Sequence, residues 1–268
     1  EGGNPDDGGQ GEGDQPQAEE PVDAGPIEQA PAPVAVDAFD RTVDGGLGEA
    51  GLGGAWTASA GSSRQSVTPG AAELRLDGAG QNTGSFLGGV VLADADVRTA
   101  FSLSSMPTGS GTYVYVTGRR TQAGEEYRVR VRVMADGRVA LALSRLSGGS
   151  EAFPGGESIV PGLTYTAGGV LHVRVQVAGV GTTEIRATAW ADGQTEPATP
   201  TITRTDSSAE LQVTGSVGLT VHRPGTSTER RPSGSPGSRL RRSPERWRGR
   251  FGRPSACPEG VRFTAHPL

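Results

Sequence analysis

The sequence predicts an all-β fold: an antiparallel jelly-roll β-sandwich over residues 37–221, with disordered flanks on both sides. Apolar and polar residues alternate in many short segments, which is the pattern of half-buried strands. Turn-forming pairs such as Asp77-Gly78 and Asp136-Gly137 separate these segments at regular spacing. No segment keeps an apolar stripe of helical period over three turns. Many short strands with even turn spacing favour a sandwich over an alternating β/α fold.

The alternation places six main strands. In chain order they are residues 97–103, 113–116, 127–133, 139–143, 171–177 and 184–190. The pattern is strictest in 127–133, where every second residue from 129 is valine and every second residue from 128 is arginine. A strand with this pattern buries its valines on one face and presents its arginines on the other.

The two flanks differ from the middle in charge and composition. Residues 1–36 carry nine acidic residues and no basic residue, and they are rich in Gly, Pro and Gln. Such a segment cannot bury enough apolar surface to offset its ordering entropy, so it is predicted to be a disordered acidic linker. Residues 222–268 form an Arg/Pro/Ser-rich tail with eleven Arg and three Glu, and this tail is also predicted to be disordered.

The change of composition at His222 is abrupt and has two interpretations. The favoured one is a shifted reading frame, because the chain has 43 Gly, 19 Pro and no Lys, which indicates a GC-rich gene. The alternative is a genuine basic tail that contacts an anionic wall polymer, a membrane or nucleic acid through its Arg charge. With the frameshift favoured, no nucleic-acid partner is expected.

Several function classes are disfavoured by composition. No run of about 18 apolar residues is present, so no transmembrane segment is expected. One cysteine, Cys257, and three scattered histidines exclude a disulfide framework and a zinc site. The folded part has no Gly-x-Ser-x-Gly motif, and its carboxylate pairs Glu125-Glu126 and Glu151 with Glu157 fall in predicted loops, where they are interpreted as solvated turn residues. We therefore expect the chain not to be an enzyme.

Specific residues resemble a known family. The segments are Asp37-Ala-Phe-Asp40, Gly53-Gly54-Ala-Trp56, Gly111-Thr-Tyr113-Val-Tyr115, Val160-Pro-Gly162, Ala189-Trp190 and Gly215-Ser-Val-Gly218-Leu. Together they resemble the concanavalin A-like (laminin-G-like) β-sandwich domains of actinobacterial secreted and surface proteins, which often lie beside PKD-type domains. The resemblance covers about residues 37–221. It implies a secreted or cell-surface location, with other domains of the same polypeptide as neighbours.

The resemblance also implies a metal site and a missing strand. Sandwiches of this type often hold one structural calcium ion between an early Asp and groups near the last strand, and Asp40 is the candidate ligand here. The alternative is that Asp40 caps a turn. The family usually has one more strand after the Gly-Ser-Val-Gly-Leu segment, whereas this chain continues into the basic tail. No other cofactor is expected.

Aromatic and arginine side chains recur in the polar phase of the strands. They are Tyr113, Tyr115, Arg128, Arg130, Arg132, Arg174, Arg186 and Trp190. We expect one concave sheet to carry all eight, because aromatic rings stack on sugars and arginine forks donate paired hydrogen bonds to hydroxyls or to uronate carboxylates. The alternative is that these residues bind no ligand and are polar only because an exposed sheet face needs polar side chains.

The sequence thus predicts a non-catalytic, extracellular carbohydrate-binding or adhesion module of a secreted bacterial protein. Its expected partner is an extracellular polysaccharide or cell-wall glycan, preferably an acidic one. Two alternatives stay open. The domain could be a structural spacer of a surface protein, or an accessory domain of a polysaccharide-degrading enzyme.

Overall fold

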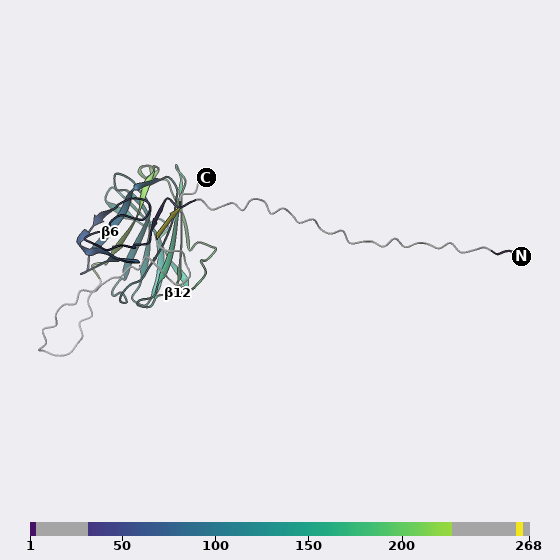
Figure 1. The fold of residues 1–268 in the computed structure, drawn as a ribbon, viewed down its shortest axis with the longest axis horizontal. Helices are drawn as coiled ribbons and strands as arrows, with labels where there is room; N and C mark the ends of the chain where they lie inside the picture. The colour runs from purple at the N-terminus through teal and green to yellow at the C-terminus, as the bar shows by residue number, and fades with distance from the viewer. Residues whose placement is uncertain (4–31, 227–260, 265–268) are drawn as a thin grey trace, which may run out of the picture. The chain divides into compact units, whose positions relative to one another are not determined.

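A computed structural model describes residues 1–3, 32–226 and 261–264 of the chain. The described residues 32–226 and 261–264 belong to one compact unit. The compact unit is built from antiparallel sheets (Figure 1), and the predicted jelly-roll sandwich is confirmed. Most of the predicted acidic linker falls outside the described residues. No helix in the described part of the chain is long and apolar enough to cross a membrane.

One large sheet has six strands. Their order across the sheet is β1 (Ala35–Asp37), β17 (Val261–Thr264), β7 (Ala95–Phe101), β13 (Leu171–Ala178), β14 (Thr183–Ala191) and β15 (Ile202–Asp206). All neighbours pair antiparallel. We refer to it as the six-stranded sheet.

The second large sheet has eight strands. Their order is β11 (Ser150–Ala152), β10 (Arg138–Ser147), β9 (Glu126–Val133), β8 (Thr112–Arg120), β16 (Gly215–His222), β6 (Asn82–Leu92) and β3 (Trp56–Ala60), with β12 (Glu157–Thr164) also paired to β10. A small third sheet joins β2 (Val43–Asp44), β4 (Gln65–Thr68) and β5 (Ala71–Leu74). Two short 3₁₀ turns, η1 (Ser62–Arg64) and η2 (Ala209–Leu211), complete the described elements.

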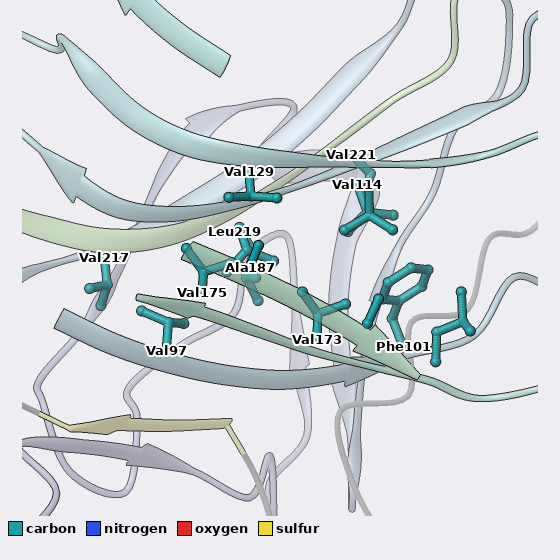
Figure 2. Close-up of a cluster of buried hydrophobic side chains, with 14 of the residues drawn as sticks. Val97, Phe101, Val114, Val129, Val173, Val175, Ala187, Val217, Leu219 and Val221 are labelled. Carbon is teal, nitrogen blue, oxygen red and sulfur yellow. The ribbon is translucent and has the colours of Figure 1, made fainter. Parts of the chain in front are cut away.

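The hydrophobic core lies between the two large sheets. Figure 2 shows the inward side chains of both, among them Val97, Phe101, Val173 and Val175 from the six-stranded sheet and Val114 and Val129 from the eight-stranded sheet. These side chains are fully buried. The valines of 127–133 lie in this core, so the predicted in-and-out pattern of β9 is confirmed.

Gly118 marks a close approach between the two sheets. A Cβ atom at this position in β8 would lie 2.4 Å from Cγ2 of Val177 in β13, which is closer than carbon atoms can pack. The strand also has a register shift between Thr117 and Arg119. Glycine therefore lets β8 bend against β13 while the following arginine enters the interior.

The sandwich uses residues that the sequence analysis assigned to the tail. Strand β16 extends to His222 in the centre of the eight-stranded sheet, and Val261–Thr264 form β17 between β1 and β7. Thus part of residues 222–268 belongs to the fold. Four residues are too few for an alternation signal, which explains why this strand was not predicted. The predicted disorder of residues 227–260 falls outside the described residues.

Candidate functional site

The eight residues predicted to share one face lie on two different faces. Tyr113 and Tyr115 of β8 and Arg128, Arg130 and Arg132 of β9 lie on the outer side of the eight-stranded sheet. Arg174 of β13 and Arg186 and Trp190 of β14 lie on the outer side of the six-stranded sheet. Because the sheets enclose the core between them, their outer faces point away from each other. The expectation of a single face was therefore wrong.

We call the outer side of the eight-stranded sheet around β8 and β9 the Tyr/Arg face. The strand register explains why its side chains meet: Tyr113 is opposite Arg132, and Tyr115 is opposite Arg130. Residues opposite each other in an antiparallel pair project from the same side of the sheet. The neighbouring β10 presents Ala140 and Ala142 on this side, which leaves room for the long arginine side chains.

Arg128 lies at the end of the Tyr/Arg face that is near Tyr115. Its guanidinium carbon lies 4.2 Å from the centre of the Tyr115 ring, within cation–π range. The same group is ion-paired with Glu126 at 3.3 Å and with Glu151 at 3.0 Å. Its Nε donates a hydrogen bond to the Ser144 hydroxyl at 3.0 Å. One guanidinium on β9 thus contacts β11 through the carboxylate of Glu151 and β10 through the hydroxyl of Ser144.

Arg130 and Arg132 occupy the other end. Both donate hydrogen bonds to the carboxylate of Glu157, at 2.9 and 3.0 Å. The Arg130 guanidinium carbon lies 4.8 Å from the Tyr113 ring centre and 3.9 Å from that of Phe153. Arg132 also donates from Nε to the Ser110 carbonyl at 2.7 Å. Here two positive charges share a single carboxylate.

The acidic members of the face were misassigned by the sequence analysis. Glu126 is the first residue of β9, Glu157 is the first residue of β12, and Glu151 lies in β11. Each is ion-paired with an arginine of the Tyr/Arg face, so the interpretation as solvated turn residues was wrong. Their position close to turn-forming Gly residues gave no signal of this pairing.

Three further side chains extend the face toward β16 and β6. His222 is opposite Tyr113, with the two ring centres 5.9 Å apart. Arg120 lies over the Phe86 ring at 4.7 Å and is ion-paired with Glu126. Burial lowers the pKa of His222, and the nearby charge of Glu151 opposes that shift. Sequence reasoning missed His222 because it stands at the change of composition.

The aromatic rings are not equally accessible. Tyr115 keeps only 4% of its surface exposed, whereas Tyr113 is partly exposed. Burial, followed by the charge of Glu151, raises the pKa of the Tyr115 phenol well above its usual value, so the hydroxyl stays protonated at any physiological pH. Tyr113 is therefore the tyrosine of this face that can contact a ligand.

On the opposite face, the predicted residues are already engaged within the chain. Arg174 donates to Asp96 at 2.8 Å and to Glu196 at 2.9 Å, and the hydrogen bond to Asp96 is the main reason that its pKa is raised. Glu196 comes from the segment after β14, which therefore lies against this face. Trp190 stacks on His172, with ring centres 5.4 Å apart.

Arg186, also on this face, is ion-paired with Glu184 of its own strand. Its guanidinium is thus matched by a carboxylate two residues away. The six-stranded sheet offers no aromatic–arginine array comparable to the Tyr/Arg face among its predicted residues.

The candidate calcium ligand Asp40 is an exposed residue after β1. In the part of the chain that the structure describes, no group of three or more His, Cys, Asp or Glu side chains could hold a metal ion. These side chains alone do not make a calcium site at Asp40, and the calcium ion stays a prediction. The buried carboxylate nearby is Asp37, which pairs with Arg41 at 2.7 Å.

Taken together, the Tyr/Arg face presents donors and acceptors in alternation. Arginine has only donors and an ionised carboxylate has only acceptors. Both types are held by ion pairs and ring contacts, so their positions are set before any ligand arrives. The face can therefore hydrogen-bond a ligand whose groups both donate and accept.

Comparison with known proteins places the fold. No protein-family model matches the chain, and no curated protein sequence matches it. Among solved structures, alginate lyase Aly36B in complex with alginate tetrasaccharide matches with a TM-score of 0.51 and 13% identity, over 90% of this chain and 99% of that chain. Bacillus licheniformis β-glucanase matches with a TM-score of 0.51 and 11% identity, over 89% of this chain and 100% of that chain. The legume lectin-like domain from Entamoeba histolytica gives a TM-score of 0.46 and 8% identity, over 79% and 90% of the two chains.

The likeness to the alginate lyase and to the β-glucanase shows that the chain has the concanavalin A-like sandwich fold. It also corrects one expectation. The sequence analysis expected no enzyme, but an alginate lyase and a β-glucanase share this fold over most of the chain. The fold is thus one that enzymes use, and the expectation is overturned.

Proposed function

We propose that the Tyr/Arg face binds a polysaccharide chain. The observation that carries the proposal is the array of guanidinium groups over aromatic rings: Arg128 over Tyr115 and Arg130 over Tyr113. Carboxylates of the same face accept hydrogen bonds from these guanidinium groups. The array lies on sheet strands rather than on loops, which is a favourable base for a precisely placed site.

The chemistry of sugars supports this choice of ligand. A sugar hydroxyl donates one hydrogen bond and accepts others, so neighbouring hydroxyls can bond to a carboxylate and to a guanidinium at once. A sugar ring also has an apolar face that packs on an aromatic ring such as Tyr113. A sheet surface several strands wide suits an extended polymer better than a small molecule, which needs a deep pocket.

The location and context belong to the same proposal. The resemblance noted in the sequence points to secreted and surface proteins, which meet polysaccharides outside the cell. We therefore propose a module of a secreted or cell-surface bacterial protein, next to other domains of the same polypeptide. If the domain were a spacer, the Tyr/Arg face would bind no ligand. If it were an accessory domain of an enzyme, the face would still bind a polysaccharide.

The test is retention of the full chain on a panel of neutral and acidic polysaccharides, measured by affinity electrophoresis. Tyr113→Ala is the informative variant, because this ring is partly exposed while Tyr115 is buried. We expect the parent chain to be retarded by at least one polymer and Tyr113→Ala to lose most of the retardation. Circular dichroism and thermal melting of each variant establish that it is folded.

Arg186→Ala is the matched control, since it removes an arginine from the outer face of the other sheet. It should leave retardation unchanged. Equal loss in Tyr113→Ala and Arg186→Ala would show that binding does not depend on the Tyr/Arg face. A folded parent chain that no polymer retards would favour the spacer role.

A further inference from the structure

We infer that Arg130 and Arg132 form a subsite for a carboxylate group, so that the preferred ligand is an acidic polysaccharide built from uronic acids. This inference rests on the proposed function and names its substrate class. It depends on how charge is distributed within the Tyr/Arg face, which differs between the two ends.

At the Arg128 end, positive and negative charges are matched. Arg128 is ion-paired with both Glu126 and Glu151, and Glu126 is also paired with Arg120. Two guanidinium groups and two carboxylates balance there. A ligand carboxylate at that end would have to lie beside two existing negative charges.

At the Arg130 end, the charges are not matched. Arg130 and Arg132 are both paired with Glu157, so two positive charges share one negative charge. Among the described residues, Arg130 donates one hydrogen bond, which Glu157 accepts. The Nε atom of Arg130 is buried without a partner. An additional carboxylate would compensate the excess positive charge and accept hydrogen bonds from the exposed N–H groups of the two guanidinium groups.

The Arg130 guanidinium is also held in place. It contacts the rings of Tyr113 and Phe153, at 4.8 and 3.9 Å from the ring centres, and its side chain keeps 13% of its surface exposed. Aromatic contact reduces the hydration of the cation, which strengthens its attraction to an anion at the remaining exposed edge. Arg132 is fixed by its hydrogen bond to the Ser110 carbonyl at 2.7 Å. Two fixed forks side by side match a planar carboxylate better than a flexible pair would.

Tyr113 adds the sugar-ring contact at the same place. It is partly exposed, lies opposite Arg132 in the sheet and is within 6.0 Å of the Arg132 guanidinium carbon. A pyranose ring packed near Tyr113 would hold its C6 carboxylate close to the two guanidinium groups. The subsite thus combines one apolar contact with one charged contact, which is the chemistry of a uronic acid residue.

The experiment compares polygalacturonate with its fully methyl-esterified form. The two polymers share the same sugar backbone, and only the first carries carboxylates. Affinity of the full chain for each is measured by affinity electrophoresis at low and at moderate salt. We expect binding to polygalacturonate to be about tenfold tighter than binding to the ester, and this difference to shrink as salt increases.

Two substitutions should shift this preference in opposite directions. Arg130→Gln removes a positive charge and should weaken binding to polygalacturonate about tenfold, with little effect on the ester. Glu157→Gln removes the competing carboxylate and should tighten binding to polygalacturonate about threefold. Arg186→Gln on the other sheet is the control and should change neither affinity. Thermal melting verifies that each variant is folded.

The outcomes separate this inference from the proposed function. If the ester or a neutral polymer binds as tightly as polygalacturonate, and Tyr113→Ala abolishes that binding, the carboxylate subsite is refuted while the sugar-binding face stands. If Glu157→Gln weakens binding to polygalacturonate as much as Arg130→Gln does, the competition between Glu157 and a ligand carboxylate is refuted. If a folded parent chain binds none of the polymers, both proposals fail.

Discussion

The guanidinium carbon of Arg128 lies 4.2 Å from the centre of the Tyr115 ring, and the ring keeps only 4% of its surface exposed. Tyr115 therefore contributes chiefly to the packing of the eight-stranded sheet and orients Arg128. Tyr113, two residues earlier on the same strand, is partly exposed. The two tyrosines look equivalent in the sequence but have different roles in the fold.

The first prediction follows from this difference. Tyr115→Ala should lower the free energy of unfolding by about 3 kcal/mol, because it removes a buried aromatic side chain and leaves a cavity under Arg128. Tyr113→Ala should cost clearly less. Urea denaturation followed by circular dichroism measures both. A larger loss of stability in Tyr113→Ala than in Tyr115→Ala would contradict this division of roles.

The sequence was sufficient to predict the strands and their inner and outer faces. Strict alternation in 127–133 and 171–177 predicted both correctly, because one face of each strand must meet the core. It could not predict which sheet each strand joins, since sheet order depends on contacts far apart in the chain. Arg130 and Arg174 have the same local pattern, yet they lie on opposite outer faces.

The ionic part of the candidate site was also beyond the sequence. Arg130 pairs with Glu157, which is 27 residues away. The intervening β10 brings β9 and β12 onto the same sheet. No local pattern encodes this pairing, because Glu157 lies at the start of its strand directly after two glycines. Only the strand register assigns these partners.

The second prediction concerns acid stability. Burial lowers the pKa of His222 below the value of about 6.5 expected in the unfolded chain. The hydrogen bond with the Gln81 backbone and the charge of Glu151 oppose this shift, and the charge of Arg128 adds to it. As the pH falls below about 7, the unfolded chain therefore takes up a proton before the folded chain does. The free energy of unfolding should decrease from about pH 7 down to the pKa of the folded state.

Comparison of the parent chain with His222→Gln checks this. Urea midpoints measured from about pH 8 to about pH 5 should fall less steeply in the variant, because its position 222 no longer titrates. An identical pH profile in the two proteins would show that His222 does not contribute to acid sensitivity.

The third prediction concerns a fully buried cation. Arg119 has no exposed surface, and its guanidinium donates to the Thr183 hydroxyl at 2.8 Å and to the carbonyls of Leu211 at 3.0 Å and Gly179 at 2.9 Å. It also donates to the carbonyl of Ala93. Since these acceptors come from separate turns and strands, one side chain connects them.

Arg119→Met should therefore lower the free energy of unfolding by about 3 kcal/mol or more, because it leaves several buried acceptors unpaired. Arg119→Lys should restore little, since a lysine ammonium cannot reach acceptors in a fork geometry. Arg138→Met, at an exposed ion pair in a turn, is the control and should leave the urea midpoint unchanged. Full rescue by lysine would argue against the multiple hydrogen bonds.

The fourth prediction tests the calcium ion expected at Asp40. If a structural calcium ion binds there, the thermal midpoint should rise in the presence of calcium and return to its starting value with a chelator. Asp40→Asn should remove the effect. A midpoint that does not respond to calcium in the parent chain would leave Asp40 with the role of an exposed turn residue.

The last prediction concerns Asp37, which the sequence analysis quoted only as part of a family motif. Its carboxylate is buried and accepts hydrogen bonds from the Arg41 guanidinium at 2.7 and 2.8 Å and from Nε1 of Trp56 at 2.7 Å. The backbone N–H of Phe39 also donates to it at 2.8 Å, and Phe39 has a φ of 53°, which is unusual for a residue other than glycine. The carboxylate thus holds β1, its following turn and β3 together.

Asp37→Asn should lower the free energy of unfolding by about 3 kcal/mol, because the partly buried Arg41 loses its charged partner and the new amide group places a donor against the donors of Arg41 and Trp56. Urea denaturation followed by Trp fluorescence measures this. Asp40→Asn, three residues away and exposed, is the matched control and should cost much less in the absence of calcium. If the two substitutions cost the same, Asp37 does not connect these strands as the geometry implies.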